Sequence, residues 1–191
     1  MSLPVFSREA LRRVDAADYP RLFSEADWGV ARVRFQLGLK GVPRKLIGCV
    51  NVAAQIDGRW VAVQFQDGRW TMPGGTRELG ESLTAAARRE LMEEAGCRLR
   101  LPRFFGAWRC ESTMSRPHQA HVPHPMFYRA VALAEGRLLS PPTNPPGAEQ
   151  IAQVQAFPLS KAEAAFRGAG RGDLADLYRL AAFLASDADS G

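Results

Sequence analysis

The sequence predicts an α/β protein in which helices flank a mixed β-sheet. Several short segments carry apolar residues in the patterns of β-strands, whereas two longer segments carry them at helical spacing. The chain has 191 residues, of which 46% are hydrophobic and 24% charged, as is typical of a globular protein. Because a domain averages about 150 residues, this length allows one domain with additional segments.

Residues 1–45 are predicted to form an extension that contains a helix and a strand. Ser7 can cap a short helix that runs to Val14. Over residues 31–37, apolar and polar side chains alternate strictly, which is typical of a half-buried strand. Gly41-Val42-Pro43 then interrupts this pattern. The main domain is therefore expected to begin after this interruption.

Residues 46–160 are predicted to form the core domain. Asp57-Gly58 has the chemistry of a tight turn between two strands, Cys49–Ile56 and Trp60–Phe65. The elements expected after them are a glycine-rich loop over 70–75, a helix over Glu81–Ala95 with Ser82 as N-cap and Gly96 as its C-terminal stop, and strands near Leu99–Cys110, Met126–Ala134 and Ile151–Phe157.

Residues 161–191 are predicted to add a C-terminal helix and a short tail that pack on the core. The segment Leu174–Leu184 is amphipathic, and polar residues follow it. Together with the helix over Glu81–Ala95, this segment gives the sheet one helix on one side and a second packed elsewhere.

The charge of the chain bears on the kind of molecule that it binds, and its cysteine content bears on the cellular compartment. The net charge is +5, from 25 Lys and Arg against 20 Asp and Glu, and only Lys40, Lys45 and Lys161 are lysines. Because arginine binds phosphate with two parallel hydrogen bonds, this fits a polyanionic substrate or nucleic acid, although compositional drift explains it equally well. The three cysteines lack metal-site spacing and favour a reducing cytoplasm over a disulfide framework.

No segment is predicted to enter a membrane. No apolar run approaches the roughly 18 residues of a membrane helix. The N-terminus, Met1 to Arg8, lacks the apolar region of a secretory signal. We therefore expect a cytoplasmic protein.

Acidic residues interrupt the apolar face of the helix predicted over Glu81–Ala95. The apolar stripe that begins at Leu83 is broken by Glu90 and Glu94, and Glu93 lies beside them. Carboxylates grouped on a half-buried surface repel one another and lose hydration. A divalent cation would relieve that cost, and oxygen ligands suit Mg²⁺ or Mn²⁺. The alternative is a surface helix with a solvated acidic face.

The residues around this helix favour the metal site over the solvated face. Pro73-Gly74-Gly75 places a tight backbone turn before the helix, and such turns bring main-chain groups close to a phosphate or metal. Arg89 precedes Glu93 by four residues, so an ion pair can hold that carboxylate in place.

These residues form a motif that resembles the Nudix box. Gly75, five residues, Glu81, seven residues and then the run Arg89–Cys97 match each specified position, and only Cys97 stands where a larger aliphatic residue is usual. The preceding run from Trp70 to Gly75 is similar to the entry loop of that family. By strand order the resemblance extends more weakly over residues 46–160, and it does not cover the extension.

The resemblance implies both a fold and an activity. It implies a Nudix-like α/β/α sandwich with a mixed β-sheet. The Nudix family hydrolyses nucleoside diphosphates linked to another moiety, using Mg²⁺ or Mn²⁺. Glu90, Glu94, the Gly75 carbonyl and also Glu93 would hold the metal. Glu81 would support them.

The resemblance leaves the general base open. Glu93 is one candidate, and Glu149, which precedes the last strand where related enzymes often present an acid, is the other. A surface residue at the strand entry is the alternative for Glu149. Arg89 would contribute to catalysis by bracing the carboxylates.

Three residues are candidates for substrate binding. Arg77, in the loop before the helix, can contact a phosphate or simply face solvent. Phe127 and Tyr128 can stack on a nucleobase, for which aromatic stacking is worth about 1–3 kcal/mol, or can pack in the core.

The sequence therefore predicts a metal-dependent pyrophosphohydrolase that acts on a nucleoside triphosphate or a nucleotide-sugar. The alternative is a catalytically weak Nudix-like module that binds a nucleotide or RNA, although such a module would be expected to lose some of the acidic residues. A homodimer through the extension is a further prediction, since the strand over residues 31–37 can pair with its own sheet or with a second subunit.

Overall fold

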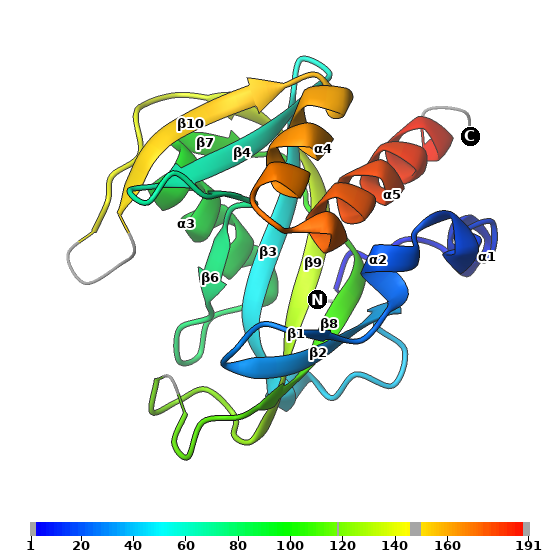
Figure 1. Cartoon of the computed structure of the whole chain (residues 1–191), viewed down its shortest axis with the longest axis vertical. Coiled ribbons are helices and arrows are strands. Elements are labelled where there is room, and N and C mark those ends of the chain that lie inside the picture. The colour runs from blue at the N-terminus through cyan, green and yellow to red at the C-terminus, as the bar shows by residue number, and fades with distance from the viewer. Residues whose placement is uncertain (1–2, 118, 146–149, 189–191) are drawn as a thin grey trace.

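A curled mixed β-sheet of ten strands carries helices on both faces in the computed structural model of the protein, which describes residues 3–117, 119–145 and 150–188 (Figure 1). The strands are β1 (Ala26–Asp27), β2 (Ala31–Leu37), β3 (Ile47–Ile56), β4 (Arg59–Phe65), β5 (Trp70–Thr71), β6 (Gly74–Thr76), β7 (Cys97–Leu99), β8 (Arg103–Ser112), β9 (Met126–Leu138) and β10 (Ile151–Phe157). The helices are α1 (Arg8–Arg12), α2 (Pro20–Phe23), α3 (Leu83–Ala95), α4 (Leu159–Gly168) and α5 (Gly172–Ala188), with 3₁₀ turns at Ala16–Asp18 and Arg44–Leu46.

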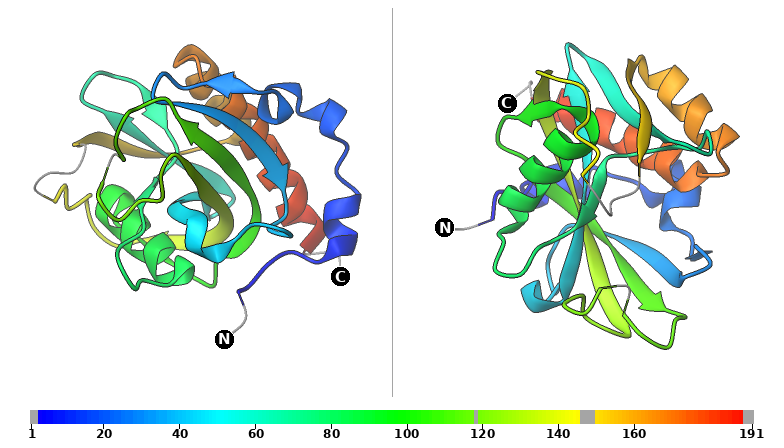
Figure 2. Two further views of the ribbon diagram at one scale, coloured as in Figure 1. Left: turned by 90° about the horizontal axis from the view of Figure 1, so that it is seen from below. Right: turned by 90° about the vertical axis from the view of Figure 1, so that its left-hand side faces the viewer.

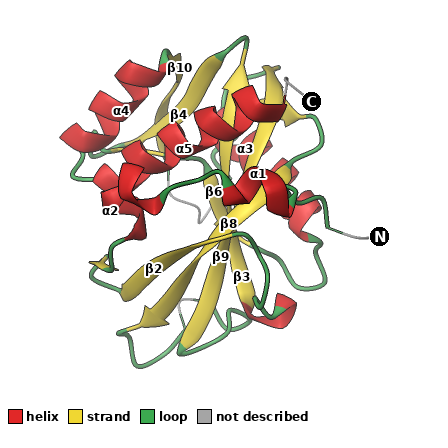
Figure 3. Ribbon diagram, turned by 90° about the vertical axis from the view of Figure 1, so that its right-hand side faces the viewer, coloured by secondary structure: helices red, strands yellow, loops and turns green. Residues whose placement is uncertain are grey.

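The arrangement confirms the predicted α/β/α sandwich. Figure 2 shows α3 on one side of the sheet in its right-hand view, and Figure 3 shows α4, α5, α1 and α2 on the opposite side. None of the helices in the described residues is long and apolar enough to cross a membrane.

The sheet is mixed because one of its central pairs is parallel. Its main path runs β1-β2-β8-β9-β3-β4-β10, and β3 lies parallel to β9, whereas the other pairs are antiparallel. On its other edge β3 first pairs with β6, through Asn51 and Gly74, and then with β4, through Gln55 and Trp60. The sheet therefore divides at β3, and this division brings the glycine-rich turn against the start of β3.

The strand of the N-terminal extension completes the sheet. β2 pairs with β8 along its whole length, from Ala31 opposite Ser112 to Leu37 opposite Gly106. Its side chains alternate between buried and exposed, as the sequence pattern predicted. Pairing within the same chain is thus present, while pairing with a second subunit stays a prediction.

Several local features match their sequence signals. Asp57 and Gly58 both have positive φ angles, as a tight hairpin turn between β3 and β4 requires. The Oγ of Ser82 accepts a hydrogen bond of 3.1 Å from the backbone N–H of Ala85, and Gly96 ends α3 with a φ of 60°.

Several boundaries differ from the prediction. The helix over 81–95 begins at Leu83, because Ser82 is its N-cap and Glu81 lies before it. The strand expected near Leu99–Cys110 is two strands, β7 and β8, separated around Pro102, which lacks the N–H that a continuous ladder needs. The extension also contains a second short helix, α2, which was not predicted and which has a proline in its first turn.

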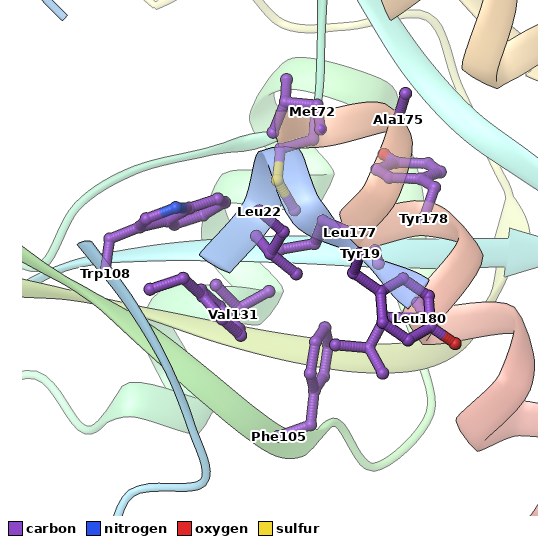
Figure 4. Packing of buried hydrophobic residues seen from close by; sticks show 14 of the residues in the cluster. Tyr19, Leu22, Met72, Phe105, Trp108, Val131, Ala175, Leu177, Tyr178 and Leu180 are labelled. Atoms are coloured by element: carbon purple, nitrogen blue, oxygen red, sulfur yellow. The ribbon is translucent and has the colours of Figure 1, made fainter. Parts of the chain in front are cut away.

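The larger core cluster lies between the sheet and α5 (Figure 4). Leu177, Leu180 and Tyr178 of α5 are fully buried in it, and Phe105 and Trp108 contribute from β8. α4, which the sequence analysis did not predict, packs against α5 by placing Phe166 on Tyr178, with 4.6 Å between the ring centroids. This packing fixes the C-terminal helices to the sheet.

A second core cluster joins α3 to the opposite face of the sheet. Leu83, Ala87 and Leu91 of α3 are buried with apolar residues of β3, β4 and β9. The apolar stripe of the helix therefore faces the sheet as predicted. The carboxylates that interrupt this stripe are held at the margin of the sheet, next to β6.

Candidate active site

Arg89 is the centre of a network that joins α3 to the glycine-rich turn. Its Nε and Nη2 donate hydrogen bonds of 3.0 Å each to the two carboxylate oxygens of Glu81. Its Nη1 contacts Glu90 at 2.9 Å and Glu93 at 3.2 Å. Its Nη2 also donates to the backbone carbonyl of Thr76 at 2.9 Å. One guanidinium thus orients three carboxylates and one strand end, including the expected pair with Glu93.

Arg89 and Glu81 shift each other's pKa values toward the charged forms. Burial acts to lower the pKa of Arg89, but the hydrogen bonds that it donates to Glu81 and the charge of Glu90 outweigh this effect, so the pKa is raised. Burial acts to raise the pKa of Glu81, yet its hydrogen bonds with Arg89 and the backbone of Glu78 lower that pKa overall. Both shifts favour the charged forms of Arg89 and Glu81, so this pair is ionic.

Glu90 is a buried carboxylate beside a glycine. Its exposed fraction is 6%, and burial raises its pKa although Arg89 acts in the opposite direction. A Cβ atom on Gly75 would lie 2.6 Å from Glu90 Oε2, closer than packed atoms approach. The absence of a side chain at position 75 therefore gives this carboxylate its space.

Glu94 is bound to the turn itself. Its Oε2 accepts a hydrogen bond of 2.8 Å from the backbone N–H of Gly74. Gly74 has a φ of 144°, and a Cβ there would lie 2.3 Å from the carbonyl oxygen of Val50. Only glycine fits this position, so the turn and α3 are joined through a conformation that other residues cannot adopt.

The donor set of this site fits a hard divalent cation. Glu90, Glu93 and Glu94 offer carboxylate oxygens next to the backbone of Gly75, and the missing Cβ of Gly75 keeps the space beside Glu90 clear. As the side chains lie in the described part of the chain, no group of three or more His, Cys, Asp and Glu residues is placed to hold a metal ion. Arg89 and the Gly74 N–H hold oxygens that a cation would attract.

Two residues of the site were missed by the sequence analysis. Arg129 of β9 donates a hydrogen bond of 3.0 Å from Nε to Oδ1 of Asn51 on β3. Asn51 is 7% exposed, and its Nδ2 donates to the Pro73 carbonyl at 3.4 Å. The signal was the arginine within the otherwise apolar run 126–134, which predicts a buried or functional cation.

The three predicted substrate-binding residues do not gather on one surface. Phe127 is partly buried in the cluster that faces α5, whereas Tyr128, only 8% exposed, packs in the cluster beneath α3. Successive residues of a strand point to opposite faces, which separates the two rings. Arg77 follows β6 directly and is held through its backbone, because its N–H donates to Gly48 and its carbonyl contacts His121 Nε2. Glu149 lies outside the described residues.

Comparison with known sequences identifies a domain family. The NUDIX domain matches residues 49–178. A MutT-like protein of Streptomyces ambofaciens is 32% identical over 68 residues, which make up 35% of this chain and 44% of that protein. The chain thus spans less than half the length of this curated relative.

Solved structures resemble the fold at low sequence identity. The pyrophosphohydrolase BsRppH of Bacillus subtilis superimposes with a TM-score of 0.54 and 18% identity, covering 70% of this chain and 77% of that one. A MutT NUDIX hydrolase from Burkholderia pseudomallei gives a TM-score of 0.42 and 19% identity, covering 62% of this chain and 94% of that one. Because the NUDIX match covers more than half of the sequence and includes the whole run from Gly75 to Cys97, this chain belongs to the Nudix family.

Proposed function

We propose that this protein is a metal-dependent pyrophosphohydrolase. It would cleave a phosphoric anhydride bond in a nucleoside diphosphate linked to another moiety, such as a nucleoside triphosphate or a nucleotide-sugar. The observation that carries this proposal is the set of three glutamates that Arg89 and Gly74 hold against the glycine-rich turn. Family membership supports the same chemistry.

The proposed metal ligands are Glu90, Glu94, the Gly75 carbonyl and also Glu93. A bound Mg²⁺ or Mn²⁺ polarises phosphoryl oxygens and lowers the pKa of a water molecule. The role of Glu81 is to support Arg89, whose positive charge acts to lower the pKa of Glu81 and of Glu90. The residues at the turn would therefore bind the metal, and Glu81 and Arg89 would hold them in position.

The general base has two candidates that experiment can separate. Glu93 has a side chain that is 31% exposed, and its Oε2 pairs with Arg89, so it is both accessible and oriented. Glu149 is the second candidate on the sequence argument. Replacing the base would lower kcat by about 10²–10⁴-fold and remove one limb of the pH–rate profile.

The test is a panel of nucleotides and nucleotide-sugars incubated with Mg²⁺, followed by identification of the products. We expect turnover that depends on the metal and falls by about 10²-fold or more in Glu93→Gln and Glu94→Gln. Glu135→Gln, at an exposed position of β9, is the matched control and should retain activity. No turnover on any member of the panel, or turnover indifferent to both substitutions, would contradict the proposal.

The second candidate function, nucleotide or RNA binding without turnover, is favoured by one observation. Arg34 of β2 lies directly opposite Arg109 of β8, both are exposed, and Arg32 lies on the same face. Like charges placed opposite each other destabilise a sheet, although Glu111 pairs with Arg109. Binding of single-stranded RNA that weakens steeply with salt, without hydrolysis of any nucleotide, would favour this candidate.

A further inference from the structure

Arg129 places a cation on the face of the sheet opposite α3. It lies beside Cys49 in the parallel β3–β9 pair, and Val131, two residues along the same strand, packs toward α5. Arg129 is half-buried, so water solvates its charge incompletely. A charge in such a position is costly unless a partner compensates it.

The described residues provide a hydrogen-bond acceptor for only one edge of this guanidinium. Nε donates to Asn51 Oδ1 at 3.0 Å. Across residues 3–117, 119–145 and 150–188, Arg129 has no ion pair, and the structure gives no acceptor for its two Nη groups. Arginine has five N–H donors, so four of them remain for another molecule.

The same guanidinium is connected to the glycine-rich turn. Asn51, which fixes Nε, donates to the Pro73 carbonyl, and it lies opposite Gly74 in the β3–β6 pair. Gly74 in turn holds Glu94. Burial acts to lower the pKa of Arg129, but nearby thiols and the charges of the carboxylates at the turn raise it overall. The cation is thus linked through Asn51 and Gly74 to Glu94, one of the proposed metal ligands.

We propose that Arg129 binds a phosphate group of the substrate through its Nη edge, and that Asn51 sets the orientation of that edge. The planar guanidinium matches two oxygens of a phosphate, and a neutral amide at Nε orients it without neutralising its charge. A carboxylate at position 51 would have neutralised it. This inference rests on the proposed function, because it adds a phosphate contact to the same site.

The test measures binding of inorganic pyrophosphate by calorimetry, in Mg²⁺ at fixed ionic strength. We expect Arg129→Gln, which keeps a hydrogen-bond donor but removes the charge, to weaken binding about 10- to 100-fold. Arg129→Lys keeps the charge without the planar edge and should lie between this variant and the wild type. Arg137→Gln, an exposed arginine of the same strand, is the matched control and should bind as the wild type does.

A second measurement serves if Arg129→Gln does not fold. The ¹⁵N-labelled Nε–H signal of Arg129, assigned by its loss in Arg129→Lys, should shift when pyrophosphate is added to the wild type. An unshifted signal, or equal affinity in folded Arg129→Gln and the wild type, overturns the inference even if nucleotides are hydrolysed. Arg129-dependent pyrophosphate binding by a protein that hydrolyses no nucleotide supports the inference and overturns only the proposed function.

Discussion

The backbone N–H of Gly74 donates a 2.8 Å hydrogen bond to Oε2 of Glu94, which lies twenty residues further along the chain. Gly74 belongs to β6 and Glu94 to α3, so this bond joins the margin of the sheet to the helix. Arg89 makes a parallel connection through the Thr76 carbonyl. Glu94 is therefore positioned by a backbone group that no side-chain substitution removes directly, whereas the other carboxylates depend on the side chain of Arg89.

The close approach of the Glu90 carboxylate to Gly75 makes Gly75→Ala an informative substitution. The new Cβ would lie 2.6 Å from the Glu90 carboxylate, so this side chain must move. We expect Mg²⁺ or Mn²⁺ affinity to fall about 10- to 100-fold, as it does when residues that orient metal ligands are changed. Metal titration by calorimetry measures this effect.

The matched control for that substitution is Gly168→Ala in α4. A Cβ at Gly168 meets no atom within 4 Å, and alanine favours a helix over glycine by roughly 0.5–1 kcal/mol. Metal affinity should be unchanged and thermal stability equal or higher. Equal metal affinity in Gly75→Ala and the wild type would contradict the role given to the space beside Glu90.

Arg89→Met should destabilise the protein as well as reduce activity. The change removes the common partner of Glu81, Glu90 and Glu93, and it leaves the Glu90 carboxylate buried without its cation. Breaking a buried ion pair costs about 3–5 kcal/mol, and we expect the lower end because the Arg89 side chain is 23% exposed. Urea unfolding of Arg89→Met and of Arg100→Met, whose ion pair is on the surface, gives the comparison.

If the two variants were equally stable, Arg89 would have no structural role beyond that of an ordinary surface charge. A substitution such as Arg89→Lys should restore part of the stability but not the two-pronged contact with Glu81, since lysine lacks a planar fork.

The sequence predicted those parts of the site that depend on neighbours in the chain. α3 and its ends follow from Ser82, Gly96 and the apolar stripe, all within one turn of the residues that they affect. The glycine-rich turn follows from adjacent glycines. Local propensity and motif spacing carry this information because each interaction spans few residues.

Interactions that depend on strand register were not predictable in the same way. Asn51 and Arg129 are 78 residues apart, and only the parallel pairing of β3 with β9 brings them together. The strand period implied that Phe127 and Tyr128 point to opposite faces of the sheet. It did not show which of these faces is open to solvent. α4 was missed because it has only two large apolar residues, Leu159 and Phe166, which do not by themselves form a helical repeat.

The inward face of β2 should contribute strongly to stability. Phe35 is 3% exposed and contacts Trp108 with 5.4 Å between the ring centroids. We expect Phe35→Ala to cost about 3–5 kcal/mol. Arg34→Ala, one residue away on the outward face, should change stability by less than about 0.5 kcal/mol. Chemical unfolding of the two variants measures the difference, and similar losses would contradict the orientation of β2.

Sedimentation of the same two variants also tests the predicted dimer. β2 pairs with β8 of its own chain, and its inward side chains are buried in the core of the same chain. A dimer that forms through this strand should therefore respond to Arg34→Ala, on the outward face. A monomer for both variants and the wild type would remove the dimer interpretation.

Tyr178 should make stability depend on alkaline pH. Its hydroxyl donates a 2.6 Å hydrogen bond to the Val61 carbonyl, and burial raises its pKa well above the ordinary value of 10.0. The unfolded chain loses this proton first as the pH rises, so the free energy of unfolding falls above about pH 10, by about 1.4 kcal/mol per pH unit for this group.

Tyr178→Phe separates this contribution from those of the buried thiols, since burial also raises the pKa of Cys97 to about 11 and that of Cys110 to about 12. We expect the variant to be about 1–2 kcal/mol less stable at pH 7, because the Val61 carbonyl loses its donor, but less sensitive to pH above 10. Its turnover should equal that of the wild type, because Tyr178 packs with Trp60 and Phe166 in the core beneath α5. Urea unfolding from pH 7 to 11 measures both effects. Identical pH slopes for the variant and the wild type would contradict the prediction, because they would show that this hydroxyl loses its proton at the same pH in the folded and the unfolded chain.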